Sequence, residues 1–416
     1  MIQLLHTPEG VRDYYNEECA QKLALCGKIR QVFSLYGYQE IMTPVFEYFD
    51  IFNAERGSVA SRDMYKLFDR DGETLVLRPD FTPSIARCAA KYFNNDTLPI
   101  RLSYLGNTYV NNSSLRGLLK ETTQAGVELV GDDSVAANAE VLALVIEVLK
   151  KAGLERFQIE IGDVRYFNGF LDAAEIPMDM RAELRNYIEN KNHFGLEMLL
   201  EKSSIPDSVA DVLIRLPHMF GDSRSILDEA KKMANNPTSL TAVERLEELC
   251  QMMESYGMGE YITFDLGMLG AHDYYTGMIF KGYTYGTGDP IVAGGRYNNL
   301  LEQFGKKAAA VGFGIGVDIL LQAMNRQKIP MKGRPEGILV LYVKERFADA
   351  VSLASDYRAQ NIPVTLIAED GRSLDSYIEF TRENHITRVL RVMADGSVPE
   401  YIPATKLNKI LPCPKE

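Results

Sequence analysis

The sequence has little that would suit a membrane span, a disulfide framework or a metal centre. None of its apolar runs approaches the roughly eighteen residues that a membrane-spanning helix needs. Residues 1–12 lack the basic start and apolar core of a signal peptide. The five cysteines are scattered, odd in number and free of CxxC pairs, which predicts a reduced, cytoplasmic setting. The five histidines show no ligand spacing, and the glycine runs match neither dinucleotide nor P-loop motifs, so we expect no metal and no cofactor.

Blocks of basic residues are also absent. The chain carries 45 Lys and Arg against 57 Asp and Glu, a formal net charge of −12. Nucleic acid or an anionic membrane would favour a basic surface, so both are disfavoured as main partners. With 416 residues and 46% hydrophobic content, the chain is long enough for about two to three domains with sizeable cores.

A predicted hairpin at residues 99–131 is the centre of the chain. Residues 100–105 alternate between apolar and polar side chains, which is typical of a half-buried strand. Residues 106–117 are polar and predict a long loop, and residues 122–131 predict a second strand. The sequence therefore predicts a two-stranded floor with a flap over it.

The second strand of this hairpin carries polar residues at an even spacing. Gln124 and Glu128 are four apart and share one strand face, whereas Val127 and Leu129 take the other. Two polar side chains opposite a packed face suit a ligand floor. The alternative is an ordinary solvated sheet face, which the spacing alone favours by about two to one.

Elements on both sides of the hairpin follow from periodicity and turn residues. Before it, we expect a helix at 17–36, an edge strand broken by Pro44, a strand pair at 64–67 and 73–77, and a helix at 83–92. After it, we expect a helix at 134–152, a strand at 157–161, a helical insertion at about 168–258, a strand at 261–266 and a helix at 298–304.

The last third of the chain is first rich in glycine and then becomes α/β. Side chains are repeatedly absent along Val311-Gly312-Phe313-Gly314-Ile315-Gly316, which permits close approach by a ligand or by another part of the chain. Beyond a linker at 326–334 we expect strands at 338–343, 364–367 and 387–392, helices at 348–360 and 377–384, and a tail at 399–416. Strands that alternate with helices predict a parallel sheet.

Seven sequence blocks stand in one order between about residues 6 and 320. They are residues 8–13 (Pro8-Glu9-Gly10-Val11-Arg12-Asp13), 38–44, 77–82 (Leu77-Arg78-Pro79-Asp80-Phe81-Thr82), 124–128, 273–277, 293–297 (Ala293-Gly294-Gly295-Arg296-Tyr297) and 312–316. In this order they resemble the catalytic core of class II aminoacyl-tRNA synthetases, specifically the histidyl one. The resemblance implies an α+β fold in which helices flank a mostly antiparallel sheet. It also implies a core at 1–325 with the helical insertion, and a small α/β domain at 335–416 similar to a reduced anticodon-binding domain.

The chain departs from the synthetase pattern at three arginines. The positions that hold the α-phosphate of ATP, the activation transition state and the γ-phosphate fall at Val110, Gly270 and Ile319. Arginine forks are the usual complement of phosphate charge. Because losing one such donor typically costs about 10²–10³ in rate, we expect almost no aminoacylation and no catalytic residue.

The amino-acid side of the synthetase pocket is retained. The resemblance implies that Asp80, Thr82, Gln124 and Glu128 surround the amino group and ring of histidine, and that Tyr274 and Tyr275 line the imidazole side. Two carboxylates suit an ammonium, and an aromatic wall suits a partly cationic ring. The histidine carboxylate would need Arg116, Lys120 or a backbone amide, and the sequence leaves this choice open.

A synthetase core that keeps its histidine pocket but lacks its ATP arginines is similar to the regulatory subunits of ATP phosphoribosyltransferase. This resemblance implies a non-catalytic homodimer, paired through residues 38–44. It also implies a hetero-oligomer with the short catalytic subunit, which it activates and places under feedback inhibition by L-histidine. The alternatives are an active histidyl-tRNA synthetase and a tRNA-binding sensor module.

Several of these residues also have structural interpretations. Tyr274 and Tyr275 alone would be ordinary sheet aromatics. Asp80 could cap the helix that begins near Pro83. Arg296 either neutralises Asp289 or Asp318, or contacts a ligand. No role is expected for His272.

Overall fold

The computed structural model describes residues 5–52, 59–93, 99–112, 119–203, 205–221, 223–270, 274–403 and 407–411. The chain divides into two compact units, residues 1–13 with 25–330 and residues 14–24 with 331–416, and each is described by itself. Within these described ranges, no helix is long and apolar enough to cross a membrane. Among the described cysteines, Cys19, Cys26, Cys88 and Cys250 are free thiols, and Cys413 lies outside the described residues.

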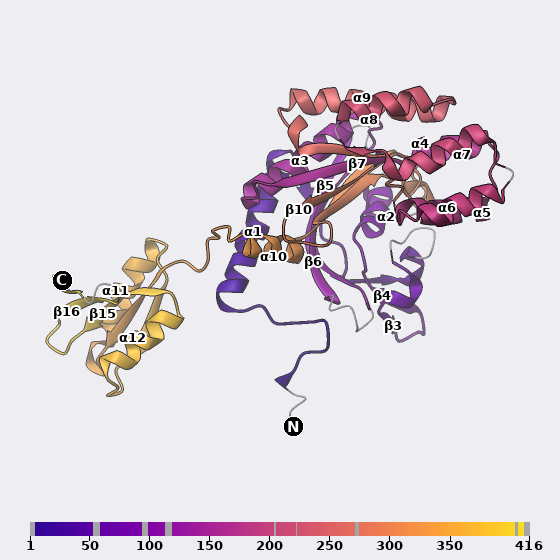
Figure 1. Ribbon diagram of the computed structural model, residues 1–416. Helices are drawn as coiled ribbons and strands as arrows, with labels where there is room; N and C mark the ends of the chain where they lie inside the picture. The colour runs from indigo at the N-terminus through magenta and orange to yellow at the C-terminus, as the bar shows by residue number, and fades with distance from the viewer. Residues whose placement is uncertain are drawn as a thin grey trace. The chain divides into compact units, whose positions relative to one another are not determined.

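A nine-stranded sheet forms the centre of the first unit (Figure 1). From one edge to the other its strands are β1 (Gln39–Glu40), β5 (Ile100–Tyr109), β6 (Glu121–Val130), β12 (Ala310–Gly316), β11 (Val292–Arg296), β10 (Met278–Thr284), β7 (Phe157–Asp163), β9 (Ile262–Asp265) and β8 (Phe220–Gly221). Only the β1–β5 and β7–β9 neighbours in this described sheet are parallel. The expected mostly antiparallel sheet is confirmed, and β1, which ends four residues before Pro44, is an edge strand.

The central hairpin is longer than the sequence predicts. Strand β5 continues to Tyr109 instead of ending near Gly106, so the prediction of a loop there is wrong. The cause is polar pairing across the hairpin. Asn107 Nδ2 donates to Glu121 at 2.8 Å, Thr123 Oγ1 donates to Asn107 Oδ1 at 2.9 Å, and the hydroxyls of Thr108 and Thr122 are 3.0 Å apart. Cross-strand partners stabilise polar strand residues that look like a loop in the linear sequence.

Helices α1 (Asn16–Leu35), α2 (Thr82–Tyr92) and α3 (Val135–Ala152) follow the predicted periodicity. Helix α10 (Val317–Arg326), which follows β12, is not predicted from the sequence. Helix α3 begins at Ser134, whose side chain accepts from Ala137 N at 3.1 Å, and ends at Gly153, where φ is +105°. Serine at the N-terminal end and glycine in the left-handed conformation at the C-terminal end are common helix caps. Residues 298–300 form a turn and residues 301–304 form a short 3₁₀ segment, η7 (Leu301–Phe304), so the helix expected at 298–304 is wrong in extent.

The predicted insertion is helical. It contains α4 (Val164–Ala173), α5 (Met178–Glu189), α6 (His193–Glu201), α7 (Asp207–Arg215), α8 (Ser223–Met233) and α9 (Pro237–Ser255). It begins a few residues earlier than expected, because Asp163 ends β7 and its side chain accepts from Arg165 N at 3.0 Å. Figure 1 shows α9 lying across the end of this region, where it contacts α3 and α4.

A small sheet supports the entry to α2. Its strands are β2 (Phe46–Tyr48), β4 (Thr74–Leu77) and β3 (Lys66–Phe68), all antiparallel. The chain leaves β4 through Arg78, which donates to the carbonyl oxygens of Asn107 and Thr43, each at 2.8 Å. These bonds fix the segment between β4 and α2 against the hairpin.

The second unit contains a five-stranded sheet. Its order is β14 (Val364–Ala368), β13 (Gly337–Tyr342), β15 (Ile386–Val392), β16 (Val398–Ile402) and β17 (Leu407–Leu411), with α11 (Phe347–Ala359) and α12 (Leu374–Glu383). The three predicted strands are parallel, as expected. The predicted tail is wrong, because β16 and β17 add antiparallel strands. Glu400 is buried in β16 and pairs with Arg388. Because a charged residue occupies a buried position, the strand lacks the regular apolar alternation by which it could be predicted.

Candidate functional site

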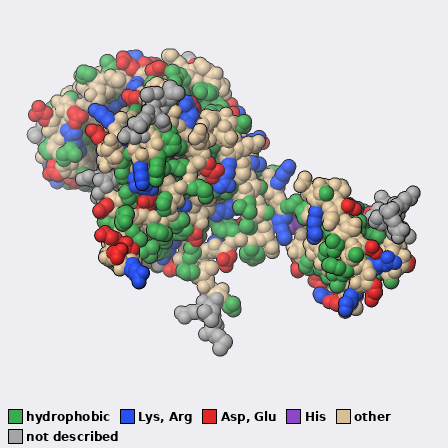
Figure 2. Space-filling view, turned by 180° about the vertical axis from the view of Figure 1, so that it is seen from behind, with side chains coloured by type: hydrophobic (Ala, Val, Ile, Leu, Met, Phe, Trp, Pro, Cys, Tyr) green, Lys and Arg blue, Asp and Glu red, His purple; other side chains and the backbone are tan. Residues whose placement is uncertain are grey.

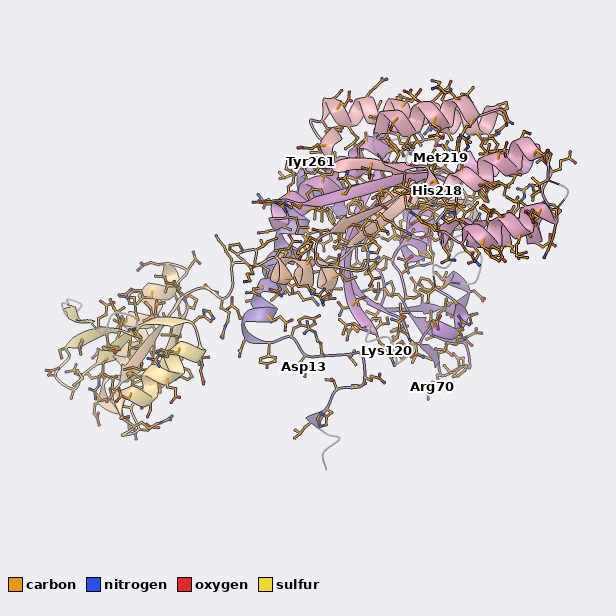
Figure 3. The ribbon with its side chains drawn as sticks, viewed as in Figure 1. Asp13, Arg70, Lys120, His218, Met219 and Tyr261 are labelled. Atoms are coloured by element: carbon orange, nitrogen blue, oxygen red, sulfur yellow. The ribbon has the colours of Figure 1, made fainter. Side chains whose placement is uncertain are left out.

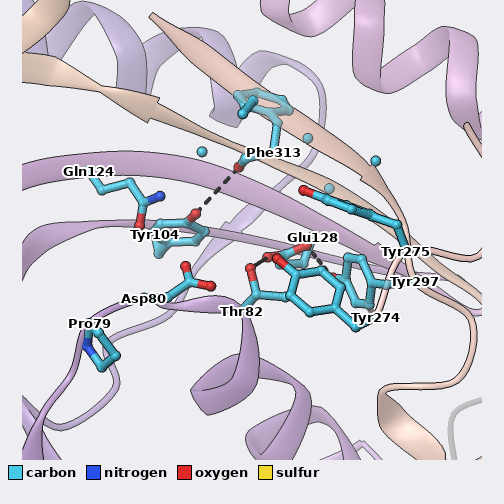
Figure 4. A pocket seen from close by; sticks show the side chains of 15 residues that line it. Pro79, Asp80, Thr82, Tyr104, Gln124, Glu128, Tyr274, Tyr275, Tyr297 and Phe313 are labelled. Carbon is cyan, nitrogen blue, oxygen red and sulfur yellow. Dashed lines mark hydrogen bonds between the residues drawn. The ribbon is translucent and has the colours of Figure 1, made fainter. Parts of the chain in front are cut away.

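A cavity of about 150 Å³ lies in the first unit, over the middle of the large sheet (Figure 4). Strands β5, β6, β11 and β12 form its floor, and the segments before α2 and before β10 form its sides. Its lining is Pro79, Asp80, Thr82, Tyr104, Gln124, Glu128, Tyr274, Tyr275, Ala293, Gly294, Gly295, Tyr297, Gly312, Phe313 and Gly314. The structure thus brings all six expected site residues together, although they come from three separate parts of the chain.

Glu128 is the most enclosed polar group of the cavity. Its side chain is 1% exposed. Thr82 Oγ1 donates to Glu128 Oε1 at 2.8 Å, and the Tyr297 hydroxyl donates to Oε2. Burial raises the pKa of the Glu128 carboxyl to about 8, because desolvation outweighs the two hydrogen bonds that favour its charged form. The solvated sheet face that the spacing favoured is therefore wrong for this position.

Asp80 supplies a second carboxylate to the cavity. It is 8% exposed, and its Oδ1 accepts from Phe81 N at 2.7 Å. Phe81 is the N-cap of α2, so Asp80 lies one residue before the start of that helix. The charge of Asp80 also raises the pKa of Glu128. Two buried carboxylates in one small cavity favour a cationic ligand.

Tyrosine rings line much of the rest of the cavity. The ring centroids of Tyr274 and Tyr275 are 4.8 Å apart at 51°, and those of Tyr274 and Tyr297 are 6.0 Å apart at 85°. Tyr104 stacks on Phe81 at 4.3 Å, and its hydroxyl donates to Phe313 O at 3.4 Å. Burial raises the pKa of Tyr274 and of Tyr275, so both stay neutral. Neutral aromatic faces suit a planar or cationic group.

The glycines of β11 and β12 make room for polar side chains of the neighbouring elements. A Cβ at Gly312 would lie 1.7 Å from Glu128 Oε2, and one at Gly314 would lie 2.2 Å from Gln124 Nε2. A Cβ at Gly295 would lie 2.7 Å from Tyr275 Cε1. The missing side chains therefore leave space for other parts of the chain, namely the side chains that line the cavity. The sequence left open whether a ligand or another part of the chain approaches these glycines.

Gln124 contributes an open acceptor. Its Oε1 is buried and has no hydrogen-bond partner in the described parts of the chain. Buried polar atoms of native proteins are nearly always satisfied by protein, water or ligand. An N–H or O–H donor of a ligand would meet this need.

The structure describes the three positions that the resemblance matches to arginines of the synthetase. Val110 follows β5, and Ile319 is in the first turn of α10. Gly270 has a φ of +83°, and a Cβ there would lie 3.1 Å from Tyr275 Cδ2. Of the described residues that line the cavity, none is Lys or Arg.

The candidates for a carboxylate partner are not at the described wall of the cavity. Lys120 lies at the entry to β6 (Figure 3), where its aliphatic carbons cover Gly10. Arg116 lies outside the described residues, as do Asp273 and His272.

Arg296 is structural. It is completely buried and donates to Asn138 Oδ1 from Nε at 3.0 Å, and its Nη1 lies 3.1 Å from Asp133 Oδ1. Further bonds reach the carbonyls of Asp132 and Ser134. Asp289 and Asp318 are therefore the wrong partners. Asp318 instead accepts from Thr123 N at 2.6 Å.

Two tyrosines of the cavity were not expected to be functional. Tyr104 follows the apolar alternation of β5 and is predicted only as a core residue. Tyr297 ends the block at 293–297, which gave no sign of its contact with Glu128. Its only signal is its place directly after a strand whose glycines leave room for other side chains.

Comparison with known proteins is consistent across the chain. The family model described as histidyl-tRNA synthetase matches residues 10–320. A protein of Acetivibrio thermocellus named ATP phosphoribosyltransferase regulatory subunit is 36% identical over 95% of this chain and 94% of its own length. A protein of the same name from Bacillus cereus is 35% identical over 95% and 93%.

Solved structures give the same result. The crystal structure of an ATP phosphoribosyltransferase regulatory subunit/histidyl-tRNA synthetase from Bacillus halodurans has a TM-score of 0.84 and 32% identity, and covers 93% of this chain and 98% of that one. A histidyl-tRNA synthetase from Nostoc, at 21% identity and a TM-score of 0.82 over 98% and 96%, shares the fold. The chain belongs to the family of ATP phosphoribosyltransferase regulatory subunits, which are built on the fold of histidyl-tRNA synthetase.

Proposed function

We propose that this chain is the non-catalytic regulatory subunit of an ATP phosphoribosyltransferase, which the short catalytic subunit needs for activity and through which L-histidine inhibits. The relatives that match nearly its whole length carry that name. The proposed histidine site is the cavity formed by Asp80, Thr82, Gln124, Glu128, Tyr274 and Tyr275.

The observation that carries this proposal is the chemistry of the cavity. Two acidic side chains, of Asp80 and Glu128, line a space of about 150 Å³ together with several tyrosines. Pockets for drug-sized ligands are typically about 300–1,000 Å³, so a molecule the size of an amino acid fits better than a nucleotide. An ammonium would meet the carboxylates, and an imidazole ring would meet the aromatic wall and the open acceptor of Gln124.

Feedback inhibition requires that histidine distinguish two states of the complex. A ligand shifts an equilibrium only by its difference in affinity for the two states. A coupling free energy of about 1–3 kcal/mol, or about 5- to 150-fold in affinity, would give useful regulation.

The test is reconstitution with a short catalytic subunit. Phosphoribosyl transfer should need both chains and should fall when histidine is added. Glu128→Ala and Tyr274→Ala should weaken histidine inhibition while the two subunits still co-purify. Tyr285→Ala is a matched control, since Tyr285 is 78% exposed. If both cavity variants remain fully sensitive to histidine, the cavity is not the sensor.

Partners follow from the same proposal. The chain would form a homodimer through residues 38–44 and a hetero-oligomer with the catalytic subunit. Binding of tRNA is not favoured, because Lys and Arg are interspersed with Asp and Glu on the face that Figure 2 shows and the net charge is −12. A gel-shift experiment with uncharged tRNA would check this.

A further inference from the structure

The surroundings of Glu128 are unusual for a carboxylate. Both of its oxygens accept from neutral hydroxyls, those of Thr82 and Tyr297, and the bare backbone of Gly312 gives Oε2 its space. The titratable groups around it, from every element of the cavity, are Asp80 before α2, Tyr104 on β5, Tyr274 and Tyr275 before β10, Tyr297 after β11 and, farther off, Tyr38 before β1. None of these described neighbours is a cation.

A carboxyl group in this environment keeps its proton when no ligand is bound. Burial disfavours the charged form, and Asp80 adds repulsion. The hydroxyl donors of Thr82 and Tyr297 oppose this and keep the pKa at about 8 instead of higher. These two hydrogen bonds therefore affect how much of Glu128 is ionised near neutral pH.

We propose that Tyr297 is a positioning residue whose hydroxyl sets the charge of Glu128, so that a cationic ligand enters the cavity in exchange for the carboxyl proton. The inference rests on the proposed function, because the ligand is the histidine of that proposal. The O–H bond of Glu128 breaks, its proton passes to water, and an N–H of the ligand's ammonium donates to the carboxylate that remains.

The exchange makes histidine binding depend on pH. Because the proton competes with the ammonium, affinity should rise as pH increases towards the pKa of Glu128, and it should fall again where the ammonium of the ligand loses its own proton. Tyr297→Phe removes one donor to the anion. Affinity at pH 7.5 should then fall roughly tenfold, since a hydrogen bond to a charged group is worth about that much. Part of this loss should be recovered near pH 8.5, where more of the Glu128 carboxyl is ionised and the ammonium of the ligand is still charged.

Calorimetry of histidine binding in buffers of different ionisation enthalpy measures the exchange directly. At pH 7.5, where free imidazole is largely neutral and the amino group of histidine is still charged, wild type should release roughly 0.8 of a proton per site for a pKa of about 8. Tyr38→Phe is the matched control, since Tyr38 OH donates to Glu140 at 3.0 Å and does not line the cavity. This control should release as many protons as wild type.

The outcomes separate this inference from the proposed function. Histidine binding without proton release overturns the exchange and leaves the histidine site intact. If histidine does not bind, the proposed function fails, and infrared spectroscopy of the empty protein still tests Glu128. A protonated carboxyl band that Glu128→Gln lacks, and that persists to higher pH in Tyr297→Phe, supports the role of Tyr297. Absence of that band at neutral pH, or no shift in Tyr297→Phe, overturns it.

Discussion

Thr82 Oγ1 donates a 2.8 Å hydrogen bond to Glu128 Oε1 and so joins the first turn of α2 to the floor of the large sheet. The two residues are 46 positions apart in the chain. Both are buried, so the bond is shielded from water. Any movement of α2 against β6 would therefore change the polarity of the cavity.

Thr82→Val should weaken histidine binding. The variant keeps the shape of the side chain but removes a donor to Glu128, so the anion that meets the ligand's ammonium is less stable. We expect the Kd at pH 7.5 to rise about tenfold, as for other hydrogen bonds to charged groups. Isothermal titration of the purified chain measures this. Thr287→Val is the control, because Thr287 Oγ1 donates only to the Thr284 carbonyl, at 3.2 Å. Equal affinities in both variants would remove Thr82 from the site.

Glu128 should make the folded chain less stable as pH rises. Its folded pKa of about 8 lies above the ordinary value of 4.5, so the native state keeps a proton that the unfolded chain has released. The free energy of unfolding should therefore fall between about pH 4.5 and pH 8, by a few kcal/mol at most. Glu128→Gln should lack this component.

Urea denaturation of wild type and Glu128→Gln at several pH values isolates the effect, since all other groups titrate in both proteins. The difference between the two free energies should change steadily across this window. A constant difference would show that Glu128 ionises normally in the folded chain.

Gly312→Ala should disrupt the cavity. The new Cβ would lie 1.7 Å from Glu128 Oε2 and 2.4 Å from the Val127 carbonyl oxygen, so both the side chain and the neighbouring strand must move. Overpacking of this kind costs about 1–3 kcal/mol of stability. Histidine binding should be lost as Glu128 is displaced. Gly288→Ala is the control, since nothing lies within 4 Å of its Cβ. Thermal unfolding measures the stability of both variants, and calorimetry measures their histidine binding. If Gly312→Ala matched Gly288→Ala in both, the close approach of Gly312 to Glu128 would be contradicted.

The family resemblance predicted six residues that line the cavity. Residues whose role depends on contacts between distant parts of the chain, such as Tyr297, were not predicted from the sequence. The spacing of Gln124 and Glu128 placed them on one face, and both line the cavity. It could not show that α2 and a set of tyrosines cover that face, because Thr82 and Tyr297 are distant in the chain. Strand β16 was missed for the same reason. Its buried Glu400 is understandable only beside Arg388 of the neighbouring strand.

The chain should catalyse no histidine-dependent exchange between ATP and pyrophosphate. Adenylate formation builds negative charge on phosphate oxygens, and the three positions that the resemblance matches to synthetase arginines hold Val110, Gly270 and Ile319. Placing arginine at all three should not produce exchange. The φ of +83° at residue 270 disfavours any side chain, and a Cβ there would press on Tyr275, on the wall of the cavity. An active histidyl-tRNA synthetase is the positive control. Exchange by the wild-type chain above the rate without histidine would establish the synthetase alternative, whereas exchange only in the triple variant would show that residue 270 tolerates arginine.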